Sequence, residues 1–362
     1  MSLFNFKQDK GMLFENYLDK ETLVQMYTAS RKKWTKYGGY NMNNMLTRLV
    51  ECRRSVFKPI FVEITNKEWL YRLKEETRNS LMIEGIFVDE DELDRALNTN
   101  YKSASEVVNY FKTARFFYNL AFEYSKTQEK LLTVALVRTC HRMLFDGLIQ
   151  NESRLGNFRY GPIKITGAKI KPSEYDIADW VKLWIRYVEY AYQKHPVHEA
   201  TARTHVLFES IHPFEDGNGR IGRILTNTIL IYYGYLNIVV KGMDDSERME
   251  YIKALESAEK GIRKLFRESA NDQTPEKIDA MFSTEDTKPL ARMIAYSLIE
   301  AFDREICSAN RDKLVKVDEF ANQIGKSADA VRKMIERKQL IAIKPEGRWL
   351  VYPQLLSDCT IE

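Results

Sequence analysis

Apolar residues recur at steps of three and four along most of the chain, which is the spacing of one face of an α-helix. The clearest stripe lies in residues 65–84 and consists of Leu70, Leu73, Thr77, Leu81 and Glu84. Thr65 and Glu68 have the spacing of a capping box at its start, and Gly85 suits a left-handed cap at its end. These patterns predict a mainly α-helical protein.

One segment, residues 156–171, departs from the helical pattern. Residues 163–165 and 169–171 alternate between apolar and polar side chains, and a Thr-Gly-Ala turn separates them. Alternation with a period of two is typical of a half-buried strand. We therefore expect a β-hairpin on an otherwise helical body.

The pattern changes again towards the C-terminus. Residues 271–289 are polar and contain two prolines, which predicts a linker. A helix resumes at Leu290, and two short helices separated by a turn at Gly325 follow it. Two short strands come last, at 341–343 and 349–352. Helix–turn–helix followed by a β-hairpin is the outline of a winged helix.

The chain should therefore consist of four parts. These are an N-terminal helical region (1–64), a helical domain (65–270), the linker (271–289) and a winged-helix-like domain (290–362). The first part contains no motif that we can interpret.

Composition limits the function classes without choosing one. Hydrophobic residues make up 44% of the 362 residues, which excludes wholesale disorder. The formal net charge of +4 is too weak for a polycation but leaves room for one basic module. Four scattered cysteines without a CxxC pair indicate neither a disulfide framework nor a zinc ribbon. Without a signal peptide or a transmembrane span, the sequence predicts a soluble, cytoplasmic protein.

The most informative segment is residues 212–223, HPFEDGNGRIGR, between two predicted helices. Pro213 disfavours helix at His212, and the glycines at 217 and 219 allow a tight turn. A glycine turn that enters a helix presents N–H groups at the positive end of the helix dipole. The segment therefore predicts an anion site, with phosphate as the usual guest.

Side chains around this turn supply the chemistry of phosphoryl or nucleotidyl transfer. Arg220 and Arg223 lie three residues apart and suit phosphate oxygens. Asp216 offers a hard oxygen ligand for Mg²⁺. His212 can accept a proton from a nucleophile near neutral pH.

The segment resembles the signature of the Fic family, HxFx(D/E)GNGRxxR. The matching positions are His212, Phe214, Asp216, Gly217, Asn218, Gly219, Arg220 and Arg223. Such proteins typically transfer AMP from ATP to a hydroxyl of a target protein. The resemblance implies a protein adenylyltransferase with ATP as substrate and Mg²⁺ as cofactor. It also implies a helical bundle with a β-hairpin flap that aligns the target.

The resemblance further implies a role for each site residue. His212 would deprotonate a target Ser, Thr or Tyr, Asp216 would hold Mg²⁺ on the α- and β-phosphates, and Phe214 would be buried. Arg220 would contact the β-phosphate and Arg223 the γ-phosphate. The ATP-binding residues would be Gly217, Asn218, Gly219, Arg220, Ile221, Gly222, Arg223 and Tyr251.

Residues 80–85, SLMIEG, resemble the inhibitory motif of the same family, (S/T)xxxE(G/N). Ser80 and Glu84 lie four residues apart, on one helix face. By resemblance, Glu84 would pair with Arg223 and withhold it from the γ-phosphate. In the family such a glutamate can also position water for the reverse reaction, the removal of AMP. The alternative is an ordinary helix end capped by Gly85.

Other assignments stay open between function and structure. Tyr251 either lies beside the nucleoside or belongs to the core. Arg159, in a GxxR run before the flap, either approaches the flap or is a structural ion-pair partner. His198, His205 and His212 recur every seven residues, but seven helical residues rise ~10 Å, which is too far for a shared metal ion.

The C-terminal module raises a second class of function. Four basic residues on its second helix could contact DNA phosphates: Arg332, Lys333, Arg337 and Lys338. Two acidic residues, Asp329 and Glu336, interrupt this basic face. We therefore favour partner recruitment or assembly over DNA binding, and leave self-modification and a homodimer open. A de-AMPylase, another nucleotidyl transferase and a DNA-binding regulator are the alternative functions.

Overall fold

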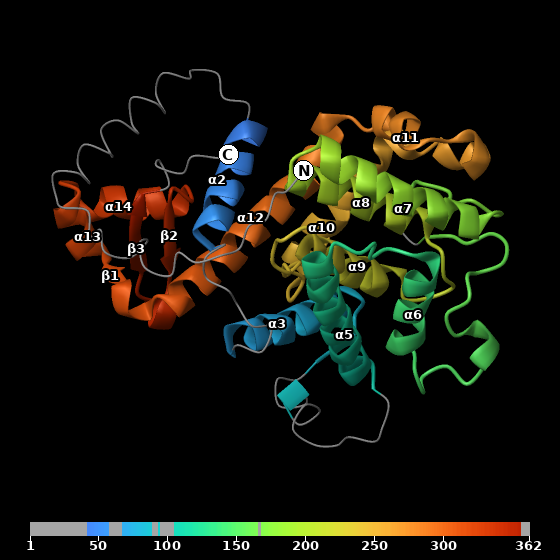
Figure 1. The fold of residues 1–362 in the computed structure, drawn as a ribbon, viewed down its shortest axis with the longest axis horizontal. Coiled ribbons are helices and arrows are strands. Elements are labelled where there is room, and N and C mark those ends of the chain that lie inside the picture. The colour runs from blue at the N-terminus through green and yellow to red at the C-terminus, as the bar shows by residue number, and fades with distance from the viewer. Residues whose placement is uncertain (1–41, 58–66, 89–92, 95–104, 166–167, 356–362) are drawn as a thin grey trace. The chain divides into compact units, whose positions relative to one another are not determined.

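The computed structural model describes residues 42–57, 67–88, 93–94, 105–165 and 168–355. The chain divides into two compact units, Leu46–Glu305 and a smaller unit that contains the residues from Ile306 onwards (Figure 1). Of the expected N-terminal region, 1–64, the structure describes only α2 (Met42–Phe57). None of the described helices is long and apolar enough to span a membrane.

The larger unit is helical, which confirms the predicted class. Its further helices are α3 (Lys67–Ile83), α5 (Glu106–Thr127), α6 (Val134–Leu144), α7 (Ile177–Lys194), α8 (Val197–Ile211), α9 (Asn218–Tyr232), α10 (Asp245–Ala258) and α11 (Pro275–Met281). α12 (Thr284–Ala309) belongs to this unit as far as Glu305. Short 3-10 helices lie at η1 (Glu152–Arg154), η2 (Glu259–Ile262), η3 (Leu265–Arg267) and η4 (Ala270–Asp272).

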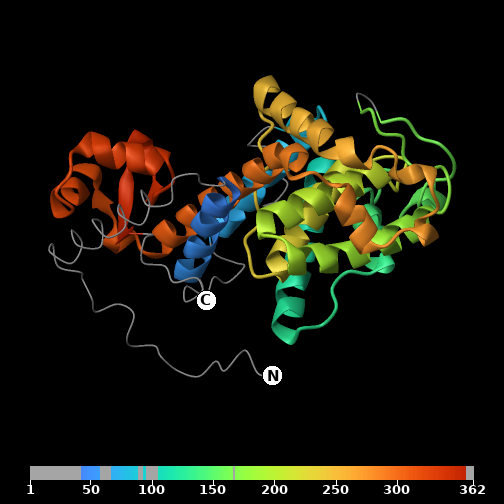
Figure 2. The same ribbon diagram turned by 90° about the horizontal axis from the view of Figure 1, so that it is seen from above.

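The central element of this unit is α9, which packs against α5 on one side and α8 on the other. Nearly every side chain of α9 is buried, and its buried polar residues Thr226, Asn227 and Thr228 have hydrogen-bond partners. α7 and α8 lie side by side in both views (Figures 1 and 2). The packing of α9 fixes the position of the turn that precedes it.

The helix predicted at 65–84 is α3, and its stripe forms part of the core. Leu73, Thr77 and Leu81 are fully buried. Gly85 has a φ of +80°, and the next N–H, of Ile86, donates to Leu81 O at 3.0 Å. The left-handed cap is therefore confirmed. Thr65, the first half of the expected capping box, lies outside the described residues.

The expected β-hairpin is not formed by the described part of residues 156–171. No strand is present at 163–165 or 168–171, although the apolar-in, polar-out alternation persists. Two strands alone are marginal in water, and no further strand pairs with this segment in the part of the chain that the structure describes. The Lys169 N–H instead donates to the Glu259 carboxylate at 3.3 Å.

Residues 271–289 are not a linker but part of the larger unit. They form η4, α11 and the start of α12, and α11 packs against α7. Pro275 stands at the first turn of α11, where proline favours a helix start. Asp279 is buried and accepts hydrogen bonds from Arg203 at 2.9 Å and Tyr187 at 3.0 Å. A buried acid of this kind anchors the segment.

The smaller unit contains the predicted pair of short helices and pair of strands. They are α13 (Val317–Gln323), α14 (Ala328–Glu336), β2 (Leu340–Ile343) and β3 (Leu350–Leu355). Two 3-10 turns, η5 (Arg311–Lys313) and η6 (Pro345–Gly347), accompany them. A further strand, β1 (Val315–Lys316), was not predicted, and it completes an antiparallel sheet of order β1-β3-β2. Its assignment as a winged helix stays a prediction.

Asp279→Ala should lower the free energy of unfolding by about 3 kcal/mol, because it leaves the buried Arg203 guanidinium without its carboxylate. Urea unfolding followed by circular dichroism measures this. Asp272→Ala, at an exposed position of the same segment, is the control and should change it by less than about 0.5 kcal/mol. Equal effects of the two substitutions would contradict the anchoring role of Asp279.

Candidate active site

The segment 212–223 forms the predicted helix–turn–helix. His212 ends α8 in a left-handed conformation, with φ +50°. Gly217 begins α9 with φ +77°, and a Cβ at this position would clash with the Phe145 ring. Glycine is therefore required here for its backbone angle and for space.

The Asn218 side chain holds the loop closed. Its amide oxygen accepts from the Phe214 N–H and its amide nitrogen donates to Phe214 O, both at 2.9 Å. Phe214 is fully buried, as predicted, and its ring stacks on His141 with centroids 4.3 Å apart. The Asn218 side chain thus shapes the loop, and only its backbone N–H is left for a phosphate.

A carboxylate lies where the turn should bind an anion. The first N–H groups of α9 have no partner within the helix, and Gly217 has no side chain to cap them. A Cβ at Gly219 would lie 2.5 Å from Glu84 Oε1 and 3.1 Å from Arg223 Nη1. Glu84 therefore sits against the positive end of α9.

The predicted pair of Glu84 and Arg223 is formed. Arg223 Nη2 donates to Glu84 Oε1 at 2.7 Å and to the Ser80 carbonyl at 2.9 Å, and Nε donates to Ser80 Oγ at 2.7 Å. Burial opposes ionisation of Glu84, but the Arg223 guanidinium prevails and lowers the pKa of this carboxyl. The Arg223 side chain is 4% exposed, whereas one-third of the Glu84 side chain is exposed.

The second arginine of the turn, Arg220, also has a carboxylate partner. Its Nη1 donates to Glu106 Oε1 at 2.9 Å, and its Nη2 lies 3.6 Å from Asp216 Oδ1. The guanidinium lies over the Phe145 ring, 5.0 Å from its centroid. Sequence reasoning missed Glu106, which is 114 residues away from Arg220 and belongs to no motif.

The His212 imidazole is arranged as a base. Its Nδ1 lies 3.2 Å from Glu209 O. Because a carbonyl only accepts, Nδ1 carries the proton and Nε2 keeps its lone pair. Burial is the main cause that lowers the pKa of His212 to about 4. The ring is therefore neutral near pH 7.

Arg159 is a positioning residue that sequence reasoning left undecided. Its guanidinium donates to His212 O at 2.7 Å, Ser173 O at 2.7 Å and Ile211 O at 3.2 Å. Its own N–H donates to Pro213 O at 3.0 Å. It thus ties the segment expected as the flap to the loop that carries His212. The GxxR run was the signal that could have identified it.

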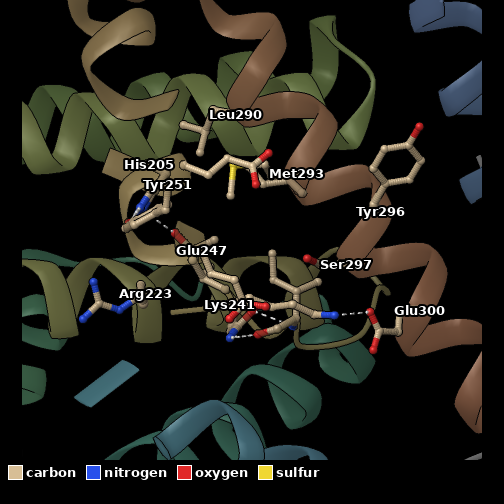
Figure 3. A pocket seen from close by; sticks show the side chains of 16 residues that line it. His205, Arg223, Lys241, Glu247, Tyr251, Leu290, Met293, Tyr296, Ser297 and Glu300 are labelled. Carbon is tan, nitrogen blue, oxygen red and sulfur yellow. Dashed lines mark hydrogen bonds and ion pairs between the residues drawn. The ribbon is translucent and has the colours of Figure 1, made fainter. Parts of the chain in front are cut away.

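Three residues predicted to bind ATP face the protein interior instead. Ile221 is fully buried, and its N–H donates to Gly217 O at 2.9 Å. Gly222 packs so closely on Glu209 that no Cβ would fit. Tyr251 is 2% exposed, and its hydroxyl lies 2.6 Å from His205 Nε2 (Figure 3). Period-three and -four spacing places these residues on the inner faces of α9 and α10.

The Asp216 carboxylate fits a magnesium ion bound together with phosphate. Its side chain is 71% exposed, and Oδ1 accepts from the Gly217 N–H at 2.6 Å. Magnesium is usually held by one or two carboxylates plus substrate phosphates. The described residues contain no group of three or more His, Cys, Asp or Glu side chains that could hold a metal ion alone. His205, the middle one of the heptad histidines, uses both ring nitrogens in hydrogen bonds with Tyr251 and Thr226.

Comparison with known proteins agrees with this geometry. Residues 131–230 match the Fic/DOC family. A probable protein adenylyltransferase of Aquifex aeolicus is 31% identical over 303 residues, which are 80% of this chain and 88% of that protein. The protein adenylyltransferase Fic of Drosophila melanogaster is 29% identical over 192 residues, 51% of this chain and 38% of that protein.

Two solved structures share the fold. A Fic domain containing signaling protein from Bacteroides thetaiotaomicron has a TM-score of 0.56 at 21% identity and covers 73% of this chain and 98% of its own. Fic-1 from C. elegans has a TM-score of 0.53 at 15% identity and covers 81% of this chain and 89% of its own. The Aquifex relative spans most of both chains, so this chain belongs to the Fic/DOC family.

The His212 ring should stay neutral from about pH 8 down to about pH 5.5, because burial lowers its pKa to about 4. Nitrogen-15 spectra of the imidazole report this, and His212→Ala identifies its signals. A titration midpoint near the ordinary histidine value of about 6.5 would contradict the assignment.

Proposed function

We propose that this site transfers AMP from ATP to a hydroxyl of a protein, and that Glu84 restrains it. The observation that carries the proposal is the place of the Glu84 carboxylate. It binds Arg223 and lies at the start of α9. Both the unpartnered N–H groups at this helix start and the Arg223 guanidinium are groups that bind phosphate. The family relatives named as protein adenylyltransferases support the reaction class.

In this proposal the turn holds the triphosphate. The N–H groups at the start of α9 and the two guanidinium groups neutralise its charge, with Arg220 at the β-phosphate and Arg223 at the γ-phosphate. Positioning and charge neutralisation are the main demands of such a transfer. The bonds of Asn218 and Arg159 keep the loop rigid for this purpose.

The neutral His212 starts the transfer. Nε2 takes the proton of the target hydroxyl while the oxygen attacks the α-phosphorus. The bond between the α-phosphorus and the bridging oxygen breaks, and diphosphate leaves. Asp216 would hold Mg²⁺, which when bound neutralises charge on the phosphates. The target is a protein hydroxyl, and the chain's own hydroxyls give the simplest assay.

Glu84 and a γ-phosphate compete for the same guanidinium. Both are anions, so they cannot share Arg223 without strong repulsion. Ser80 would keep two of the Arg223 hydrogen bonds when Glu84 leaves. These two bonds keep Arg223 near the turn, while the loss of the Glu84 contact leaves its guanidinium free to shift towards the nucleotide.

DNA binding is not part of this proposal. Arg332 on α14 forms an ion pair with Asp329 at 2.7 Å, which reduces the basic charge of that helix. A homodimer also has no observation in its favour among the described residues.

Glu84→Gly should raise self-modification on the order of 10- to 100-fold, because it removes a charge-assisted hydrogen bond that competes with ATP. Intact-mass spectrometry after incubation with ATP and Mg²⁺ counts the AMP adducts. Glu84→Gln, which keeps the shape and loses the charge, should give an intermediate increase. An unchanged adduct level in folded Glu84→Gly protein that binds ATP would refute the inhibitory role.

His212→Ala in the Glu84→Gly background should abolish the adduct, because it removes the neutral imidazole that takes the hydroxyl proton. ATP affinity, measured by calorimetry, should change by less than about 3-fold, since His212 is not a phosphate ligand. Retained transfer would overturn the assignment of the base. Lost ATP binding would instead show that the substitution disturbs the loop.

A further inference from the structure

A cavity of about 240 Å³ lies behind Arg223, bounded by α8, α9, α10 and α12 of the larger unit (Figure 3). Residues of α9 and α10 line it, among them Arg223, Thr226 and Tyr251. At ~30 Å³ per water, this volume corresponds to about eight waters, or to a ligand of roughly ten heavy atoms. Of segment 212–223, Arg223 alone contributes to its lining.

Three side chains linked by hydrogen bonds form the inner wall of the cavity. Thr226 Oγ1 lies 2.9 Å from His205 Nδ1, and His205 Nε2 lies 2.6 Å from the Tyr251 hydroxyl. Burial lowers the pKa of His205 to about 3, so this ring is neutral. Because these polar atoms satisfy one another, the inner end of the cavity carries no charge for a ligand.

The sides of the cavity are apolar, and they suit the hydrophobic part of a ligand. They are formed by Ile238, Val240, Leu290, Met293 and Ile294. An apolar body of the size of one ring would bury its surface against them, which is the main source of affinity for a small ligand.

The remaining charged lining residues have an excess of negative charge. Lys241 pairs with Glu300 at 3.3 Å. Glu247 and Glu250 of α10 also line the cavity, and neither forms an ion pair within the described residues. Three carboxylates thus face the Lys241 ammonium group, because the other cationic lining residue, Arg223, is paired with Glu84 outside the lining. This imbalance favours a cationic ligand.

We propose that this cavity binds a small organic cation with an apolar body of one ring and acts as an effector site. The stem of Arg223 forms part of the wall while its guanidinium is bound to Ser80 and Glu84. A ligand that fits this shape favours the state in which Glu84 holds Arg223. By linkage, the contact between Glu84 and Arg223 must favour ligand binding by the same factor. The proposal that the cavity binds this ligand is independent of the proposed function, whereas the coupling to Glu84 rests on it.

Phenethylamine is the probe, with phenethyl alcohol and phenylacetate as matched neutral and anionic compounds. Binding is measured by chemical-shift changes in the full chain without ATP, so that it does not depend on transfer. Phenethylamine should bind about 5-fold more tightly than the alcohol, as expected for one partly exposed ion pair, and phenylacetate most weakly. Equal affinity for the three compounds would overturn the proposal.

Two variants locate the binding. Glu250→Gln should remove most of the preference for the amine, whereas Asp245→Asn should not, since it removes the same charge from α10 outside the cavity lining. Ser297→Phe should fill the cavity and abolish binding of the amine and the alcohol, with circular dichroism as the test of folding. Binding that survives Ser297→Phe in folded protein would overturn the site.

The coupling has its own test. Glu84→Gly should weaken phenethylamine binding, because Arg223 is no longer held in the position that completes the wall. Equal affinity of the amine for wild type and Glu84→Gly would overturn the effector role. Absence of any AMP adduct in Glu84→Gly would instead count against the transferase, since the binding experiment contains no nucleotide.

Discussion

The buried contact between Glu84 and Arg223 is the interaction on which the proposed function depends. Arg223 is buried and its guanidinium keeps its charge at all ordinary pH values, so it needs an anionic partner at all times. Two partners suit the position, a carboxylate from α3 or a phosphate at the start of α9. Glu84 supplies the carboxylate in this structure, and in the proposed function the substrate supplies the phosphate. In that proposal, restraint and substrate binding both meet the need of Arg223 for an anionic partner.

Side-chain hydrogen bonds hold the loop between α8 and α9 in one conformation. Asn218 bonds to both backbone groups of Phe214, and Arg159 binds the carbonyls of His212 and Ile211. These bonds use backbone groups, so they fix the loop whatever substrate is present. Glu84, just after the end of α3 and one-third exposed, is less enclosed than Asn218 or Arg159.

Two of the sequence-based predictions failed for a shared reason. Alternation at 163–171 and polarity at 271–289 describe the local chain, but strands and packed helices need partners. Among the described residues the first segment has no neighbouring strand, so its alternation does not produce a paired strand. The second gains partners from α7 and from Arg203, which make a polar stretch part of the fold. Nothing in the sequence of residues 271–289 itself indicates that α7 or Arg203 packs against it.

The sequence by itself determined the helical class, the glycine turn, the burial of Phe214 and the pairing of Glu84 with Arg223. Helix periodicity and a long motif are local properties, so they can be recognised without knowledge of the rest of the chain. Only the tertiary structure decided that Glu106 holds Arg220, that Arg159 supports the His212 loop and that Tyr251 faces a cavity. These contacts join residues that lie far apart in the sequence, and packing brings them together.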